Sequence, residues 1–319
     1  MQNKIKIFSD AIKNAKTIAV VAHKNPDGDA LCSVLAMARL IELNFGRESV
    51  CIYDGNVPDN LDNVPFRGRA RFFAKLDTSA SFDLVILMDY GTVRNIGGPL
   101  EIIQNAKCVI EIDHHKNDEP IGQLCIDDED AAATGIIVYE MMRTAKWKYD
   151  LDVLKLLGYT ILTDTGTFKF IRTSAPLRIM ADLVDAGVSI RSLMDSLNNK
   201  PRKTIQTEAA AAANAEFFYR GRLAVATIRR ADYKRLDGRG ETVLNLLAQI
   251  KGVEYIVLIK EQRENQIGLS FRGRTCPVDA IATAFGGGGH TYAAGAIVRN
   301  ESLDDVRKRV LEYFKGEMK

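Results

Sequence analysis

Short, continuously apolar runs recur along the first half of the chain, and helical patterns separate them. The runs are TIAVVAH (17–23), SVCIYD (49–54), FDLVILMD (82–89) and KCVIEID (107–113). After the first run, apolar residues recur at helical spacing at Leu31, Val34, Leu35, Ala38 and Ile41. Strands that are buried on both faces show such unbroken apolar runs, so the pattern predicts a parallel sheet covered by helices on both sides.

All four runs end in a polar residue, and three of these residues, His23, Asp89 and Asp113, belong to motifs that suggest chemistry. In open α/β sheets, ligands bind at the carboxyl ends of the strands. We therefore expect a binding site at this edge of the sheet. Further helices are predicted at about 132–145 and 151–163, and they would complete the cover of the sheet.

The second half of the chain has a different rhythm, which follows a break around 187–203. A connecting helix is predicted over 203–218, because an alanine run there favours helix. Strands are predicted at 222–228, 254–260, 265–272 and 293–299, and helices at 241–250, 278–285 and 302–314. The predicted architecture is α/β: a Rossmann-like parallel-sheet domain (1–188), a helical linker (189–215) and a smaller α/β domain with a mixed sheet (216–319).

The composition is that of a soluble globular protein, with 46% hydrophobic and 26% charged residues. No apolar run approaches the ~18–20 residues that a membrane-spanning helix needs. The first residues carry no apolar signal-peptide core, so we expect a cytoplasmic protein. The five cysteines are scattered and form no CxxC pair, which argues against a disulfide framework and a zinc ribbon.

The small net charge of +2 conceals an asymmetry between the two halves. Residues 1–199 carry 22 Lys and Arg against 27 Asp and Glu, a balance of −5. Residues 200–319 carry 21 against 14, a balance of +7. An acidic half suits cations and a basic half suits a phosphate-bearing ligand.

All four histidines of the chain lie in motifs that suggest chemistry. The candidate metal ligands and their neighbours are His23, Asp27, Asp29, Asp89, Asp113, His114, His115 and Asp164. Imidazoles and carboxylates without thiolates suit Mn²⁺, or Mg²⁺, Fe²⁺ or Co²⁺, better than structural Zn²⁺. These groups are too many for one ion, and they suggest two ions about 3.5–4 Å apart.

Candidate phosphate ligands lie in the second half. Four consecutive glycines, Gly286 to Gly289, precede His290 and would expose backbone N–H groups to an anion. Ser270 and Arg272 end a predicted strand, where the guanidinium can bind phosphate through two hydrogen bonds. Phe271, between them, should point to the opposite face and enter the core.

The motifs together carry a family resemblance. HKNPDGDALCS, MDYG, IDHH and LTDTGTF resemble the four ordered motifs of the DHH phosphoesterase family. FGGGGHTYAAGA (285–296) resembles the glycine-rich signature of the DHH-associated C-terminal domain. The length is most similar to the bacterial nanoRNase subgroup, which includes bifunctional oligoribonuclease/3′-phosphoadenosine-5′-phosphate phosphatases.

The resemblance implies roles for individual residues. One Mn²⁺ ion would be held by His23, Asp27 and Asp89. The other would be held by Asp29, Asp89, His114 and Asp164, with Asp89 bridging the two ions. Asp113 would orient His114, and His115 would face the scissile phosphate, which makes Asp89, Asp113 and His115 the expected catalytic residues. The family pattern favours Ser270 and Arg272 as substrate ligands, and Gly287, Gly288, Gly289 and His290 would bind the terminal phosphate with them. Arg94 is a further candidate for its spacing after Asp89 alone, and the sequence leaves open whether it binds a phosphate or lies at the surface.

One position departs from the family pattern. Many relatives have a small polar residue where this chain has Tyr90. The aromatic ring would either stack on a base of the substrate or pack in the protein interior, and the sequence leaves both readings open.

The implied activity is hydrolysis of RNA of about two to five nucleotides, with release of phosphate from 3′-phosphoadenosine-5′-phosphate. Alternatives are a phosphodiesterase for cyclic-di-AMP or pApA, a pyrophosphatase or exopolyphosphatase, and a non-catalytic nucleotide sensor. All six expected ligands are present, which disfavours the sensor. The small net charge, with no further oligonucleotide-binding domain, disfavours binding to long strands or duplexes. No membrane partner is expected. A homodimer is common in relatives, and the sequence leaves the oligomeric state open.

Overall fold

The computed structural model describes residues 1–76, 81–236 and 240–318. The chain divides into two compact units, Met1–Asn199 and Lys200–Lys319, which are described one after the other. None of the helices in the described ranges combines the length and the apolarity that a bilayer crossing requires.

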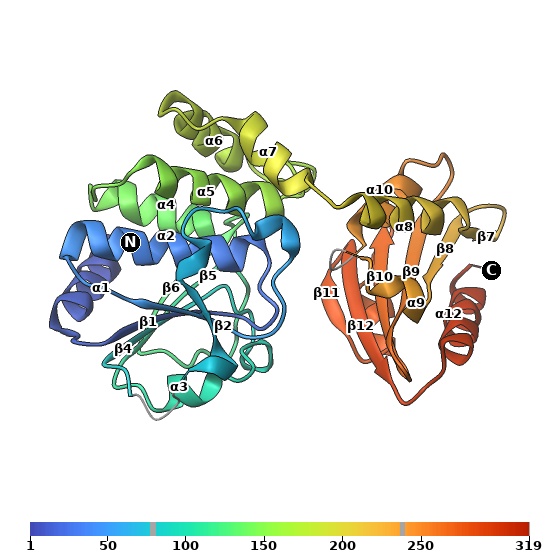
Figure 1. Ribbon diagram of the computed structural model, residues 1–319, viewed down its shortest axis with the longest axis horizontal. Helices are drawn as coiled ribbons and strands as arrows, with labels where there is room; N and C mark the ends of the chain where they lie inside the picture. Colours follow the sequence, from blue (N-terminus) through green and yellow to red (C-terminus); the bar gives the residue numbers. More distant parts are fainter. Residues whose placement is uncertain (77–80, 237–239, 319) are drawn as a thin grey trace. The chain divides into compact units, whose positions relative to one another are not determined.

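The first unit is built on a six-stranded sheet in which every neighbouring pair of strands is parallel (Figure 1). The strand order is β3-β2-β1-β4-β5-β6. The strands are β1 (Ile18–Ala22), β2 (Val50–Tyr53), β3 (Ala70–Phe72), β4 (Leu84–Met88), β5 (Val109–Asp113) and β6 (Leu124–Asp127). The Rossmann-like parallel sheet predicted from the apolar runs is thereby confirmed.

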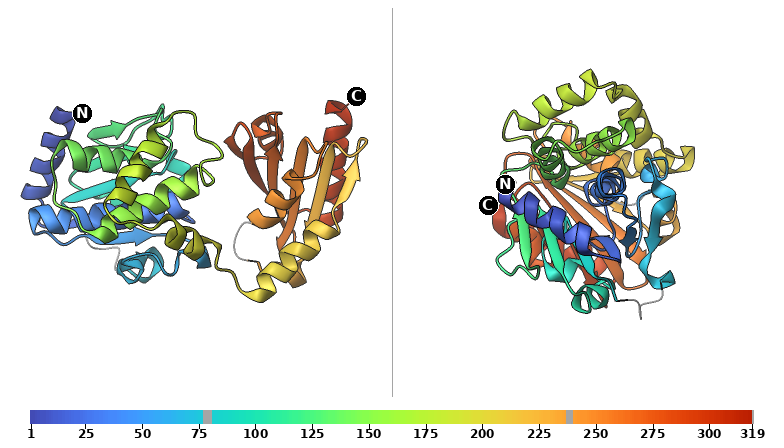
Figure 2. Two further views of the ribbon diagram at one scale, coloured as in Figure 1. Left: turned by 90° about the horizontal axis from the view of Figure 1, so that it is seen from above. Right: turned by 90° about the vertical axis from the view of Figure 1, so that its left-hand side faces the viewer.

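Helices cover both faces of this sheet, as predicted. One face carries α2 (Gly28–Phe45) and α4 (Thr134–Thr144), with α5 (Leu151–Asp164) packed on α2. The other face is covered by α3 (Leu100–Gln104) and by residues of the loops. The helices α6 (Ala175–Asp185) and α7 (Ile190–Asn198) pack against α5 on the side away from the sheet (Figure 2). The remaining elements are α1 (Gln2–Asn14) and four 3₁₀ turns, η1 (Asp59–Leu61), η2 (Arg67–Arg69), η3 (Phe73–Lys75) and η4 (Val93–Asn95).

The two edge strands of the sheet, β3 and β6, were not predicted from the sequence. Their sequences, ARF and LCID, are short and only partly buried. An edge strand faces solvent along one side and lacks the continuous apolar run that marks a central strand. The four central strands were predicted because their residues are buried on both faces.

The second unit contains a mixed six-stranded sheet in the order β11-β12-β10-β9-β8-β7. Only the β8–β9 pair is parallel. The strands are β7 (Glu216–Phe218), β8 (Leu223–Ile228), β9 (Tyr255–Arg263), β10 (Gln266–Gly273), β11 (Gly288–His290) and β12 (Ala293–Arg299). The helices are α8 (Arg202–Ala213), α9 (Arg230–Tyr233), α10 (Glu241–Ala248), α11 (Asp279–Ala284) and α12 (Leu303–Glu317). The helices α8 and α10 cover one face of the sheet, and α11 and α12 cover the other.

The predicted connecting helix over 203–218 is too long. Helix α8 ends at Ala213, and Asn214 closes it through a side-chain hydrogen bond to the carbonyl of Ala210. The next residues, Glu216–Phe218, form β7 and pair with β8. The alanine run stabilises the helix as far as Ala213. The residues after it, which include Phe217 and Phe218, form the edge strand of the sheet.

The predicted domain limits, 1–188, 189–215 and 216–319, stay a prediction. The segment 189–215 contains α7 and α8 and is therefore mostly helical. The helix α7 belongs to the first compact unit and α8 to the second.

Candidate metal centre and active site

The predicted ligands of the first unit meet at the carboxyl edge of its sheet. His23 follows β1, and the loop after it leads into α2, where Asp27 caps the helix and Asp29 lies in the first turn. Asp89 follows β4, and His114 follows β5. Asp164 is the last residue of α5. Four sequence segments thus supply side chains to one place, three of them because the neighbouring parallel strands β1, β4 and β5 end at the same edge.

One group of potential ligands consists of His23, Asp27 and Asp89, whose ligand atoms lie within 4.8 Å of one another. The Nε2 atom of His23 is 3.8 Å from Oδ1 of Asp27 and 3.9 Å from Oδ2 of Asp89. Separations of this size are too long for direct hydrogen bonds and leave room for a cation between the atoms. The set coincides with the ligands that the resemblance implied for the first ion.

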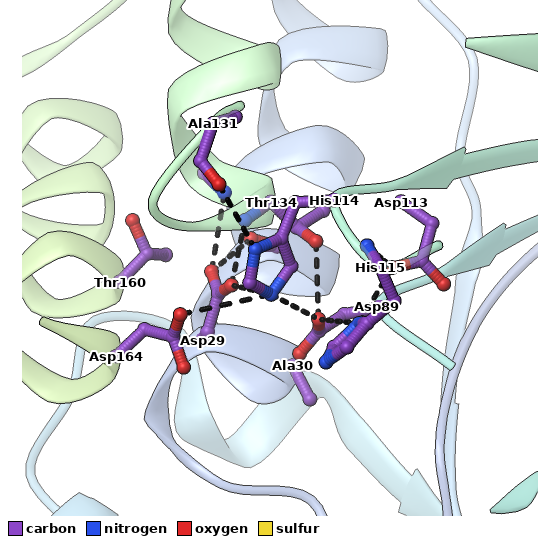
Figure 3. A network of polar contacts seen from close by, with 12 residues as sticks. Asp29, Ala30, Asp89, Asp113, His114, His115, Ala131, Thr134, Thr160 and Asp164 are labelled. Carbon is purple, nitrogen blue, oxygen red and sulfur yellow. Dashed lines mark hydrogen bonds and ion pairs between the residues drawn. The ribbon is translucent and has the colours of Figure 1, made fainter. Parts of the chain in front are cut away.

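A second group consists of Asp29, His114 and Asp164. The Nε2 atom of His114 lies 3.9 Å from Oδ2 of Asp29 and 3.6 Å from Oδ2 of Asp164. Oδ1 of Asp89 is 3.5 Å from the same nitrogen (Figure 3). One oxygen of Asp89 therefore faces His23 and the other faces His114, which is the arrangement a bridging carboxylate needs.

The side chain of His114 provides the test of whether a cation fits. Its Nδ1 atom lies 3.1 Å from the carbonyl oxygen of Ala131, and because a carbonyl only accepts, Nδ1 must donate. Nε2 then carries a lone pair. That atom is buried and has no hydrogen-bond partner among the described residues. A buried lone pair surrounded by carboxylate oxygens matches a divalent metal ion with nitrogen and oxygen ligands.

The carboxylates of this centre are crowded. Burial, followed by the negative charge of Asp164, raises the pKa of Asp29 from 3.8 to about 7. Burial, with the charge of Asp29 as the next cause, raises the pKa of Asp89 well above its usual value. Both shifts have the sign expected when several carboxylates share a buried site without a cation. A divalent ion would reverse that effect and hold the groups ionised.

Thr134 connects the two ligand groups, and the sequence did not predict its role. Its hydroxyl donates to Oδ1 of Asp89 at 3.1 Å, and its backbone N–H donates to Oδ2 of Asp29 at 2.6 Å. The next N–H, that of Gly135, donates to Oδ1 of Asp29 at 3.1 Å. A Cβ at Gly135 would lie 1.9 Å from the hydroxyl oxygen of Thr160, so only glycine allows this approach. The one local signal of Thr134 is its place near the start of a predicted helix.

Asp113 organises the loop behind the potential metal ligands. Its Oδ1 accepts hydrogen bonds from the backbone and Nδ1 of His115 at 2.9 and 2.8 Å. Its Oδ2 accepts from the backbone N–H groups of Tyr90 and Gly91 at 2.9 and 2.7 Å. These bonds stabilise Asp89 at φ +52°, a left-handed conformation that is uncommon for residues with a side chain.

The expectation that Asp113 orients His114 is wrong. Asp113 orients His115, while the carbonyl of Ala131 orients His114. The two histidines follow a strand end, and their rings point to different partners: His114 toward Asp29 and Asp164, and His115 toward Asp113. Sequence adjacency therefore did not identify the hydrogen-bond partner.

The ionisation of His115 is set by its surroundings. Burial lowers its pKa, but the hydrogen bond to Asp113 and that residue's charge raise it more, so the pKa is raised overall. Burial raises the pKa of Asp113, but the hydrogen bonds and charge of His115 together with the hydrogen bond from the Gly91 backbone outweigh it, so the pKa is lowered overall. Each group thus favours the charged form of the other, and the pair lies beside Asp89, whose Oδ1 is 3.5 Å from His115 Nδ1.

Tyr90 packs in the interior, and its side chain does not offer a face to a substrate base. Only 1% of its surface is exposed, and it lies in the core beneath the sheet. Its hydroxyl accepts a hydrogen bond from the amide of Asn117. The departure from the family pattern at this position is a packing feature.

Arg94 lies on η4, exposed, in the segment that follows Asp89. The backbone of the neighbouring Asn95 accepts a hydrogen bond from the N–H of Lys24 at 2.6 Å. Arg94 therefore projects from a segment that is bonded to the loop carrying His23 and Asp27. Its proposed contact with substrate stays a prediction.

The predicted substrate ligands of the second unit lie on β10 and β11. Ser270 is 3.0 Å from the ammonium nitrogen of Lys260, a residue that is only 5% exposed and that the sequence did not single out. Arg272 is paired with Glu241 at 2.5 Å. Phe271 is buried in the core, as its alternation with these two residues predicted.

Part of the glycine run lies in an edge strand, and its predicted role in binding an anion stays a prediction. Gly288 to His290 are β11 and pair with β12. A Cβ at Gly287 would lie 2.0 Å from the carbonyl oxygen of Gly295, and one at Gly289 would lie 2.7 Å from that of Ala293. These glycines are required by close packing of two strands. The side chain of His290 lies outside the described part of the structure.

Comparison with known proteins identifies both halves of the chain. Residues 17–162 match the DHH family, N-terminal domain, and residues 222–316 match the DHHA1 domain. A bifunctional oligoribonuclease and PAP phosphatase of Thermus thermophilus is 29% identical over 99% of this chain and 94% of its own length. A probable manganese-dependent inorganic pyrophosphatase of Staphylococcus aureus is 29% identical over 49% of this chain and 50% of its own length.

A solved structure agrees with the fold of the whole chain. It is an exopolyphosphatase-related protein from Bacteroides fragilis, with a TM-score of 0.88 and 20% identity, and the match covers 100% of this chain and 98% of that protein. The two matched domains occur in the order that the motifs predicted. The chain belongs to the DHH family of phosphoesterases, with an N-terminal DHH domain followed by a DHHA1 domain.

Proposed function

We propose that this protein hydrolyses short RNA oligonucleotides to mononucleotides with two bound Mn²⁺ ions, and that it also releases phosphate from 3′-phosphoadenosine-5′-phosphate. The observation that carries the proposal is the position of Asp89, whose two oxygens face two different groups of potential ligands. The substrates are proposed from the name of the Thermus relative, which is similar over nearly the whole chain.

The proposed ligands of one ion are His23, Asp27 and Asp89, and those of the other are Asp29, Asp89, His114 and Asp164. Nitrogen and carboxylate oxygen donors without thiolate suit Mn²⁺. The name of the Staphylococcus relative, a manganese-dependent enzyme, supports the same choice of metal. When bound, two such ions lower the pKa of a water molecule and stabilise the negative charge that develops on phosphate oxygens.

The residues around the ions have separate tasks in this proposal. His115 uses Nδ1 to bond Asp113, which leaves Nε2 as the atom that holds or delivers a proton at the substrate. The raised pKa of His115 favours the protonated ring, which suits contact with a phosphate and transfer of a proton to the leaving oxygen. Asp113 and Thr134 position the reacting groups without touching the substrate.

The proposed ligands of the substrate's terminal phosphate are Ser270, Arg272, Gly287, Gly288, Gly289 and His290. The surplus of basic residues in the second half supports this assignment. Arg94, in the first unit, is proposed separately as a phosphate ligand. We add Lys260 to the proposed phosphate-binding residues. Its ammonium group is buried and contacts Ser270, so it adds positive charge to that face of the sheet. A cytoplasmic location stays a prediction, and the oligomeric state stays open.

The test compares substrates side by side on the purified, Mn²⁺-loaded protein. The measured quantity is kcat/KM for a 5′-labelled diribonucleotide, pApA, cyclic-di-AMP, 3′-phosphoadenosine-5′-phosphate and pyrophosphate. We expect the diribonucleotide to be preferred and the phosphatase reaction to be the second activity. An Asp89→Ala variant serves as the control, because loss of the bridging carboxylate should abolish turnover of every substrate.

Two outcomes would replace the proposed substrates. A preference for cyclic-di-AMP would move the protein to the turnover of cyclic dinucleotides, and a preference for pyrophosphate would make it a pyrophosphatase. Full activity of the Asp89→Ala variant with bound Mn²⁺ would show that the two-metal assignment is wrong.

A further inference from the structure

Tyr53, Arg67 and Phe72 form a layered aromatic and cationic surface at the end of β2 and β3, which we call the Tyr53 platform. Tyr53 and Phe72 are paired in the parallel register of these strands, so their side chains lie on the same face of the sheet. Their ring centroids are 5.7 Å apart, with 34° between the ring planes. The guanidinium carbon of Arg67 lies 5.2 Å from the centroid of the Tyr53 ring. All three side chains are partly exposed.

Arg67 differs from its neighbour Arg69 in the hydrogen bonds that its guanidinium group makes. Arg69 donates to the carboxylate of Glu42 at 2.9 Å, which is a structural role. The Nε atom of Arg67 is buried and has no hydrogen-bond partner among the described residues. The nearest carboxylate oxygen recorded for it, Oδ1 of Asp62, is 3.8 Å away, beyond hydrogen-bond range. The guanidinium of Arg67 is thus held by a long ion pair with Asp62 and by its contact with the Tyr53 ring, and neither uses a direct hydrogen bond from Nε.

The platform adjoins the metal centre through the loop after β1. The carbonyl of Asp54, the residue after Tyr53, accepts a hydrogen bond from the N–H of Asn25 at 2.8 Å. Asn25 lies between His23 and Asp27, which belong to the first group of metal ligands. In the strand order β3-β2-β1-β4, the platform strands lie on one side of β1 and Asp89 follows the strand on the other.

We propose that the Tyr53 platform is a stacking site for the nucleotide base that lies beyond the scissile phosphate of a short RNA. The inference rests on the proposed function and adds a base-binding subsite to it. Aromatic rings and arginine guanidinium planes are the side chains on which unpaired bases stack. Stacking tolerates any base sequence, which fits an enzyme that degrades oligonucleotides of mixed sequence.

One basic side chain, that of Lys24, lies on the same route. Lys24 is exposed on the loop between β1 and α2, next to His23 and Asn25. A Cβ at Gly97 would lie 3.1 Å from the Cβ of Lys24, so the segment after β4 packs closely against this loop. A substrate chain with its scissile phosphate at Asp89 would pass Lys24 and bring its next base to Phe72 along the carboxyl edge of the sheet.

The test uses two platform variants, Arg67→Gln and Phe72→Leu, and a matched control, Arg71→Gln. Arg71 is exposed on β3 between the platform positions, and it pairs with Ile52, so that its side chain lies on the opposite face. The control removes the same charge from the same segment without touching the platform. Thermal stability and Mn²⁺ content are measured for each variant, so that a folding defect is recognised.

We expect both platform variants to lower kcat/KM for a diribonucleotide about tenfold relative to kcat/KM for 3′-phosphoadenosine-5′-phosphate, which has one base only. The Arg71→Gln control should keep the wild-type ratio. An unchanged ratio in Phe72→Leu, or an equal change in the control, would overturn the platform.

If the wild-type protein cleaves neither substrate, the proposed function fails separately from the platform. The dissociation constant of a fluorescent diribonucleotide for the Mn²⁺-loaded protein then provides the test. A weaker affinity in Phe72→Leu than in Arg71→Gln would support the platform, and equal affinities would contradict it.

Discussion

The hydroxyl of Thr134 donates a hydrogen bond to Oδ1 of Asp89 at 3.1 Å, across 45 residues of sequence. The backbone N–H of Thr134 also donates to Asp29, so one residue holds a carboxylate of each ligand group. Because Thr134 is completely buried at the start of α4, the position of this helix is coupled to the geometry of the metal centre.

Replacing Thr134 with valine should weaken Mn²⁺ binding about tenfold, because residues that orient metal ligands typically contribute 10–100-fold to affinity. Valine preserves the shape of the side chain and removes only the hydroxyl. Titration calorimetry of the metal-free protein measures the affinity. Thr134→Ser keeps the hydroxyl and should restore affinity to near the wild-type value. Equal affinities in the valine variant and the wild type would show that the hydroxyl serves folding alone.

An Asp113→Asn variant should lower kcat about 100-fold while the protein still binds Mn²⁺, in line with the contribution of a positioned proton donor. The amide cannot accept hydrogen bonds at both of the positions where Asp113 now accepts from His115 and from the Tyr90–Gly91 backbone. Steady-state kinetics and metal analysis on the same sample provide the measurement.

The control for this variant is Asp127→Asn. Asp127 pairs with Asp113 in the register of the neighbouring strand, but it is exposed and contacts Lys4. Its substitution should leave kcat at the wild-type level. A similar loss of activity in both variants would mean that strand-end charge in general, and not the bond to His115, matters.

Arg272→Ala should raise KM about tenfold and leave Mn²⁺ content intact, because the residue is proposed to bind phosphate by charge-assisted hydrogen bonds. The guanidinium is now paired with Glu241, so Glu241→Gln should free it and change KM in the opposite direction or not at all. Arg274→Ala, two residues further along the chain, is the matched control. Metal loss in Arg272→Ala would contradict the separation of metal and substrate ligands.

The stability of the metal-free protein should fall as pH rises from about 5 to 8. The pKa of Asp29 is raised to about 7 by burial and by the charge of Asp164, from 3.8 for a free carboxyl. A group with a raised pKa in the folded state stabilises it fully below the unfolded pKa, and this contribution is lost as pH rises through the folded value. Asp89 acts in the same direction.

Differential scanning fluorimetry of EDTA-treated protein, with and without Mn²⁺, measures this effect. The rise in Tm on adding Mn²⁺ should be larger at pH 8 than at pH 5, because metal binding requires deprotonated carboxylates. Asp29→Asn should flatten the pH dependence of the metal-free protein. An equal rise in Tm at both pH values would indicate that Asp29 and Asp89 are already ionised without metal.

Most of the first unit was predictable because its central strands are unbroken apolar runs, such as 82–89. The strands β3 and β6 were missed, since edge strands carry a weaker pattern. The connecting helix was extended into β7 because helix propensity does not register that Glu216–Phe218 pair with β8. At these residues the hydrogen bonds to the neighbouring strand outweigh the local preference for helix.

The prediction of the metal centre depended on residue type and on position relative to strand ends. His23, Asp89 and His114 could be named because strand ends of a parallel sheet converge. The partner of Asp113 could not be named, because a hydrogen bond depends on the direction of a side chain. The same holds for Tyr90, whose ring could have faced either the substrate or the core.

The amino-acid sequence alone thus specifies the parallel sheet and the types of ligand. Strands buried on both faces require unbroken apolar runs, and a metal site requires imidazole and carboxylate side chains at the strand ends. The sharing of Asp89 between two ligand groups, the contact of Thr134 with Asp89 and the stacking of Arg67 on Tyr53 depend on the tertiary structure. These contacts join residues from different elements, most of them far apart in sequence, and they form only when the strands take their order in the sheet and α4 packs against its end.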